Sequence, residues 1–175
     1  MIIDPDYVRA HIKVPTGTTD EQLQDVIDRA LDRMRVHCRW HVFPELQDTA
    51  TVSTDGSGSV NLPSLNVVEV ERVEIRGQVV DGFEFDRDGR LRLTSGRFPD
   101  ALGAVKVTML HGYSEDELDA VRDVLLGMVE RVIALPHFIK SSASGDRSVT
   151  YGVDAALRPT FGDKEVLDEY RIARR

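Results

Sequence analysis

A chain of 175 residues has the length of one compact domain, and about 70% of its unfolded surface can be buried without a metal or a disulfide. Its formal net charge of −8, from 30 acidic and 22 basic side chains, disfavours general binding to nucleic-acid backbones. The single cysteine, Cys38, excludes an intramolecular disulfide and fits a reducing compartment. Early acidic residues and the lack of a long apolar run argue against a signal peptide or a membrane span, so we expect a soluble, unprocessed chain.

Residues 1–48 are expected to form two helices of a bundle. Asp4 before Pro5 is a good start for a short helix to about Ile12, because the carboxylate can cap amides and proline favours the first helical position. A second helix should follow and end before Pro44. Its capping box is formed either by Thr18 and Glu21 or by Thr19 and Gln22. Its apolar positions recur at spacings of three and four: Leu23, Val26, Ile27, Ala30, Leu31, Met34 and Cys38.

Residues 49–112 are expected to form an antiparallel β subdomain, because their apolar residues alternate with a period of two. Strands are predicted at 51–53, 59–62, 67–75 and 105–109. A hairpin is predicted from two alternating pairs around the turn at 86–89: Phe83 with Phe85, and Leu91 with Leu93. The alternation changes phase between Val70 and Val73, so we expect a bulge near Glu71.

The longest helix is expected within residues 113–140. It follows a Gly-Tyr pair, Ser114 and Glu117 would form its capping box, and Pro136 would end it. Residues 141–175 are expected to form a C-terminal arm, flexible at the small polar residues 141–145 and ending in a short helix at 163–174. The predicted fold class is α+β: a small helical bundle with an inserted antiparallel β subdomain and a C-terminal extension ending in a short helix.

Few residues have the spacing of a catalytic or metal site. His37 and His41 lie four apart on one helical face beside Cys38, which is the nearest approach to a zinc site, but no third ligand stands at a suitable spacing. Residues 55–59 resemble a phosphate loop only in composition, and 86–89 are too few for a calcium loop. We therefore predict no enzyme, no catalytic residue, no cofactor and no bound metal. Two alternatives stay open: a metal-dependent hydrolase using His37 and His41, and a monomeric acidic adaptor that binds a cellular partner.

The order of the expected elements carries a resemblance to a known family. An N-terminal helical pair is followed by a β-rich insertion, a strand ending in Gly112-Tyr113, a long helix, a loop ending in Tyr151-Gly152 and a short helix ending in Tyr170-Arg171. Over nearly its whole length the chain resembles the head-to-tail connector, or adaptor, proteins in the necks of long-tailed phages (siphophages). The family often has proline at the start of the helix after the Gly-Tyr pair, where this chain has residues 114–116, Ser-Glu-Asp.

The resemblance implies a structural virion protein of the neck, between the capsid portal and the tail, assembled in the cytoplasm of a host bacterium. It implies a ring of twelve copies beneath the portal, in contact with the portal and with the next neck or tail-completion protein. Double-stranded DNA would pass through the lumen without specific binding, and an acidic lining would let it slide. No membrane is involved. The possible lumen-lining residues are Glu115, Asp119 and Asp123.

The terminal helix is the expected portal-docking element. It is too short to be stable alone, so its apolar side must pack on something. The plain alternative is that it folds back on its own bundle, whereas the resemblance favours the portal. The expected docking residues are Val166, Leu167, Tyr170, Arg171 and Arg174. On this hypothesis, deleting residues 163–175 would leave the subunit folded and abolish binding to portal rings.

Overall fold

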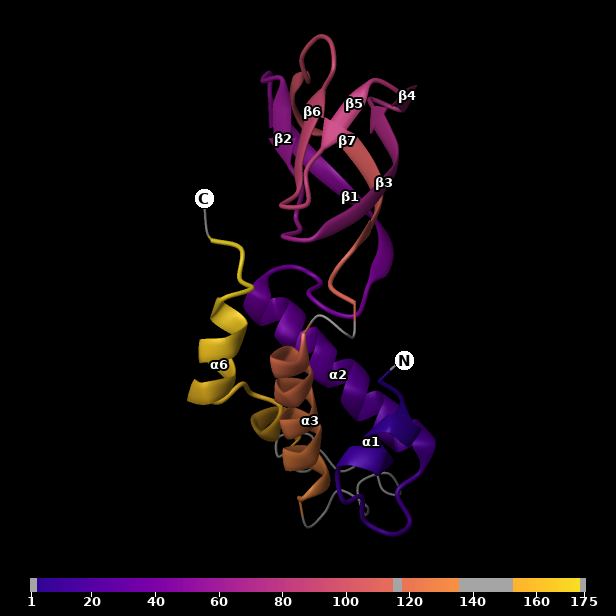
Figure 1. The fold of residues 1–175 in the computed structure, drawn as a ribbon, viewed down its shortest axis with the longest axis vertical. Helices are drawn as coiled ribbons and strands as arrows, with labels where there is room; N and C mark the ends of the chain where they lie inside the picture. The colour runs from indigo at the N-terminus through magenta and orange to yellow at the C-terminus, as the bar shows by residue number, and fades with distance from the viewer. Residues whose placement is uncertain (1–2, 115–117, 136–152, 174–175) are drawn as a thin grey trace. The chain divides into compact units, whose positions relative to one another are not determined.

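The computed structural model describes residues 3–114, 118–135 and 153–173 (Figure 1). The chain divides into two compact units. The helical unit consists of Met1–Cys38 and Glu115–Arg171, and the β unit consists of Arg39–Ser114 and Ile172–Arg175. The β unit thus begins about ten residues before the expected position 49. The expected C-terminal arm does not form a part of its own, because its described residues are divided between the two units.

The helical unit begins with α1 (Pro5–His11) and α2 (Asp20–Cys38). Asp4 caps α1 as predicted, accepting a hydrogen bond of 2.8 Å from the backbone N–H of Tyr7. Of the two possible capping boxes on α2, the structure contains the one formed by Thr19 and Gln22, with hydrogen bonds of 2.9 and 3.2 Å. The predicted apolar stripe of α2 is buried except for Leu31, which is half-buried.

The described residues of this unit also include α3 (Asp119–Ile133) and α6 (Phe161–Asp168). With 15 residues α3 is shorter than α2, which has 19, so the expectation that it is the longest helix is wrong. Its N-cap position is Leu118, which makes no capping hydrogen bond, and Glu117 lies outside the described residues. The flexible segment expected at 141–145 also lies outside them. Among the described residues, no helix is long and apolar enough to cross a membrane.

The terminal helix α6 begins earlier and ends earlier than predicted. Thr160 and Asp163 form a capping box at its start. The N–H of Thr160 donates to Asp163 Oδ2 at 2.8 Å, and the N–H of Asp163 donates to Thr160 Oγ1 at 3.2 Å. Residues 153–156, the first described residues after 135, are also helical. Asp154 fixes this segment to α2 through ion pairs of 2.8 Å to Arg29 and 3.2 Å to Arg33.

The β unit contains two antiparallel sheets. The four-stranded sheet has the order β1-β7-β3-β4 and the three-stranded sheet has the order β2-β6-β5. The strands are β1 (Leu46–Asp55), β2 (Ser59–Asn61), β3 (Val67–Ile75), β4 (Gln78–Val80), β5 (Phe83–Phe85), β6 (Arg90–Leu93) and β7 (Asp100–His111). The predicted hairpin is confirmed as β5–β6, and apolar residues of both sheets share one core.

Strand β3 contains the predicted bulge and a second one. Its pairing with β7 skips Glu71, as expected, and also skips Val68. Two bulges separated by three residues give this strand a buried position at every third residue: Val67, Val70 and Val73 are buried, whereas Val68 is 43% exposed. The core face of β3 therefore differs from a simple alternation.

Gly112 directly follows β7, at a place where no side chain fits. Its φ is 100°, and a Cβ there would lie 2.9 Å from the carbonyl oxygen of Pro44. Hydrogen bonds on either side hold this position: the N–H of Gly112 donates to Asn66 O at 3.0 Å, and that of Tyr113 to Val42 O at 2.8 Å. The Gly-Tyr pair thus joins the end of β7 to the segment that opens the β unit.

Candidate functional site

The expected docking helix, α6, packs against its own bundle. Leu167 is completely buried, and its carbonyl oxygen accepts a hydrogen bond from the Cys38 thiol at 3.5 Å. Burial, followed by the negative charge of Asp168, raises the pKa of Cys38 to about 11, so the thiol keeps its proton. The side chain of Leu167 thus belongs to the core of the helical unit and is not exposed for docking, which is the plain alternative to the portal-docking prediction. Deleting residues 163–175 would remove Leu167 from this core, so the subunit should not stay folded as stably as the docking hypothesis supposes.

Polar contacts hold α6 in the same place. His37 Nε2 lies 2.9 Å from Asp168 Oδ1, and Arg131 pairs with Asp163 at 2.7 Å. The hydrogen bond from His37, with a smaller effect of Arg171, keeps the pKa of Asp168 below its ordinary value. Several long-range contacts thus support the fold-back.

The other expected docking residues have different surroundings. Val166 and Tyr170 are half-buried, and Arg171 is exposed and lies 3.4 Å from Asp168. Arg174 lies outside the described residues. The structure therefore leaves Val166, Tyr170 and Arg171 as a surface beside the end of α6, which we call the α6 end surface.

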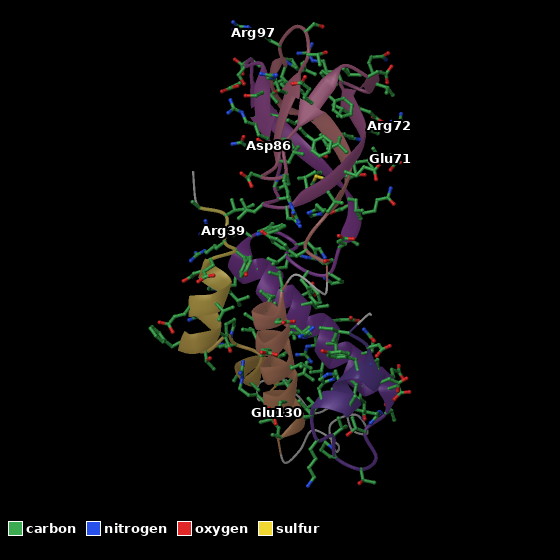
Figure 2. The ribbon with its side chains drawn as sticks, viewed as in Figure 1. Arg39, Glu71, Arg72, Asp86, Arg97 and Glu130 are labelled. Atoms are coloured by element: carbon green, nitrogen blue, oxygen red, sulfur yellow. The ribbon has the colours of Figure 1, made fainter. Side chains whose placement is uncertain are left out.

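Acidic side chains form a stripe on α3. Asp119 and Asp123 are exposed, and Asp119 pairs with Arg122. Glu130, labelled on α3 in Figure 2, is exposed as well. Because residues separated by four and eleven positions return to nearly the same side of a helix, these acids share one face. Glu130 was not among the predicted lumen-lining residues, although its spacing from Asp119 and Asp123 is visible in the sequence. Glu115 lies outside the described residues.

The two histidines considered for a metal fall in different units. His37 uses Nε2 for Asp168, and His41 Nε2 bonds to the carbonyl oxygen of Pro44. The ring of His41 lies 5.9 Å from that of His111, and Trp40 lies 6.0 Å from Tyr113, so these side chains form an aromatic cluster. In the described part of the chain, no group of three or more His, Cys, Asp and Glu side chains could hold a metal ion.

A helical unit with an inserted β unit of two antiparallel sheets defines the class of fold, α+β. The same fold occurs in solved structures of gene transfer agent (GTA) particles. A chain from the neck of an empty GTA particle, with C6 symmetry, aligns over 97% of this chain and 89% of its own, with a TM-score of 0.64 and 16% identity. A chain from the neck of a native particle, with C12 symmetry, aligns over 97% and 88%, with a TM-score of 0.63 and 14% identity.

A third similar chain comes from the virion of a native GTA particle and aligns over 97% of this chain and 89% of its own, with a TM-score of 0.65 and 15% identity. No protein-family model and no curated protein sequence matches this chain. At these identities the likeness establishes the fold, which the chain shares with neck proteins of phage-like particles.

Proposed function

We propose that this chain is a non-enzymatic structural protein of a virion neck, a head-to-tail connector that forms a ring beneath the portal. The observation that carries the proposal is the alignment of almost the whole chain, both units included, with chains of GTA particle necks. A likeness that covers 97% of the chain, and so residues of both units, is more specific than a likeness of one common subdomain would be.

The C6 and C12 symmetries of those necks favour a ring here, and twelve copies is the number that the family resemblance also implies. Such a ring would contact the portal on one side and the next neck or tail-completion protein on the other, with double-stranded DNA passing through its lumen. The acidic stripe on α3 is our candidate for the lumen lining, because exposed carboxylates repel phosphate and do not retain the duplex.

The α6 end surface is the candidate for contact with the portal. Arg171 is exposed at the end of this helix, where its charge could meet an acidic surface on a partner. Leu167 is not part of this surface because its side chain is buried. The remaining contact residues, Val166 and Tyr170, are half-buried and could add apolar area at the rim.

The test combines the purified chain with purified portal rings and follows complex formation by sedimentation and electron microscopy. We expect a ring of this chain to sediment with the portal. Arg171→Glu should weaken the complex, whereas Arg158→Glu, an exposed arginine of the same unit, should leave it unchanged. A chain that stays monomeric with portal rings and is missing from purified particles would contradict the proposal.

A further inference from the structure

Basic and apolar side chains gather at one end of the outer face of the four-stranded sheet. Val79 of β4 and Lys106 of β7 belong to one row of the strand pairing, joined through Glu74 of β3. Val105 and Val107 on either side of Lys106 are completely buried, so this row points away from the core. Val79 and Lys106 are therefore both exposed on the same face of the sheet.

A bulge in β7 adds two more exposed side chains to this end of the sheet. Three residues of β7, 102–104, stand opposite a single residue of β1. Leu102, in the bulge, is 92% exposed. The N–H of Arg76 donates to the carbonyl oxygen of Ala104 at 2.8 Å, so the turn after β3 lies beside the bulge. The side chain of Arg76 is exposed as well.

These four residues form a surface that we call the β7 patch: Arg76, Val79, Leu102 and Lys106. Its two cations make no ion pair within the part of the chain that the structure describes. Glu74, in the same row as Lys106, pairs with Arg72 at 2.7 Å. Two large apolar side chains left in water beside unpaired cations, in a chain of net charge −8, indicate a docking surface for an acidic partner with an apolar centre.

The outer face of α2 has the complementary composition. Exposed residues separated by three, seven and eleven positions from the first return to nearly the same side of this helix, and we call them the α2 stripe: Asp25, Asp28, Asp32 and Val36. Val36 is 74% exposed. Asp25 and Asp32 pair with arginines of the same helix only at 3.6 Å, and exposed pairs of this kind are weak, so the stripe stays acidic.

The other acidic helix faces lack this combination. The acidic stripe on α3 has no exposed large apolar side chain among its described residues. On α6, Phe161 is 79% exposed, but Lys164 stands one turn further along the same helix and puts a cation beside the apolar ring. The α2 stripe is thus the face that matches the β7 patch in both charge and apolar character.

We propose that the β7 patch of one copy docks on the α2 stripe of a neighbouring copy. Leu102 packs against Val36, and Lys106 faces Asp32. Because the two surfaces differ, the contact is heterologous, and its head-to-tail repetition gives a ring when the rotation closes. The inference rests on the ring of the proposed function and names the surfaces through which its copies meet.

The test exchanges the two charges across the contact. Sedimentation velocity of the full chain, alone and with portal rings, gives the concentration at which half of the chain is assembled. We expect Lys106→Glu and Asp32→Lys each to raise this concentration about three- to tenfold, and the double variant to return to within about twofold of the wild type. Arg97→Glu is the matched control: it reverses an exposed arginine of the same unit outside the patch, labelled in Figure 2, and should change nothing.

The apolar part of the contact has its own variant. Leu102→Ser should raise the half-assembly concentration about tenfold or more, because it removes a leucine that the contact buries. The side chain is exposed in the single copy, so the melting temperature of the unassembled chain should stay unchanged.

Four results would overturn the proposal. A wild-type ring whose assembly Lys106→Glu, Asp32→Lys and Leu102→Ser leave unchanged would refute the contact and leave the neck function standing. Weaker assembly in both charge variants without recovery in the double variant would show that the two charges do not face each other. A wild-type chain that stays monomeric alone and with portal rings would refute the ring and the contact with it. Duplex DNA binding that Lys106→Glu abolishes would give the patch a different partner.

Discussion

Replacing Gly112 by alanine should destabilise the β unit more than replacing Gly77, although both glycines have positive φ, 100° and 79°. Each variant puts a Cβ into a left-handed backbone, at a cost of about 1–2 kcal/mol, and each gains about 0.4–1 kcal/mol from a less flexible unfolded chain. Only at Gly112 would the new methyl group meet fixed backbone, 2.9 Å from Pro44 O and 3.3 Å from Glu45 Cα. Nothing lies within 4 Å of the corresponding position at Gly77.

Forcing one methyl group into a filled site costs about 1–3 kcal/mol. We therefore expect Gly112→Ala to lower the free energy of unfolding of the β unit by about 2–4 kcal/mol, and Gly77→Ala by about 1 kcal/mol. A guanidinium titration can follow the fluorescence of Trp40, the single tryptophan, which lies beside Tyr113 in the aromatic cluster. Equal losses in the two variants would show that the approach of Pro44 does not constrain position 112.

Four further outcomes are expected. Leu167→Ala should lower the free energy of unfolding by about 2–5 kcal/mol, whereas Lys164→Ala, on the exposed side of α6, should change it by less than about 0.5 kcal/mol in the same denaturant titration. Asp168→Asn should reduce stability at neutral pH but not in strong acid, as melting curves across pH will show. The hydrogen bond from His37 lowers the folded-state pKa of Asp168 below its ordinary value of 3.8. The stabilisation is therefore present above pH 3.8 and is lost as the pH falls through the folded-state pKa. His41→Ala should leave the metal content unchanged, and about one zinc per chain by elemental analysis, lost together with the fold on chelation, would contradict this. The isolated chain should not bind duplex DNA tightly, so salt-sensitive binding in fluorescence anisotropy would refute an acidic lumen.

Sequence patterns were sufficient to predict elements in which residues close in the sequence are also close in the structure. The apolar stripe of α2 and the β5–β6 hairpin could be predicted because helix and strand periods are set by the backbone. The bulge at Glu71 was visible as a change of phase. The second bulge, at Val68, could not be predicted, because the sequence does not distinguish an exposed valine in a strand from a buried one. Only the pairing of β3 with β7 shows that Val68 is exposed.

Contacts between distant parts of the chain could not be predicted in this way. The partner of Leu167 is Cys38, 129 residues away, and Ile172 contacts Arg39, 133 residues away. The sequence indicated that α6 needs a surface to pack on, but no periodicity says which one. The family resemblance favoured the portal, and the structure instead places Leu167 in the core of its own unit.

The insertion of the β unit between α2 and α3 also sets an order of events during synthesis. The bulk of the β unit is one continuous stretch, Arg39–Ser114, whereas the helical unit needs residues from both sides of it. At about 5–20 residues per second, a ribosome needs about 4–16 s to pass from the end of α2 to the start of α3. During that interval the apolar face of α2 has no α3 to cover it, and β7, the strand that pairs with both β1 and β3, is made last. We therefore expect the four-stranded sheet to close only when β7 has been made, and the apolar face of α2 to be the segment that stays uncovered for longest.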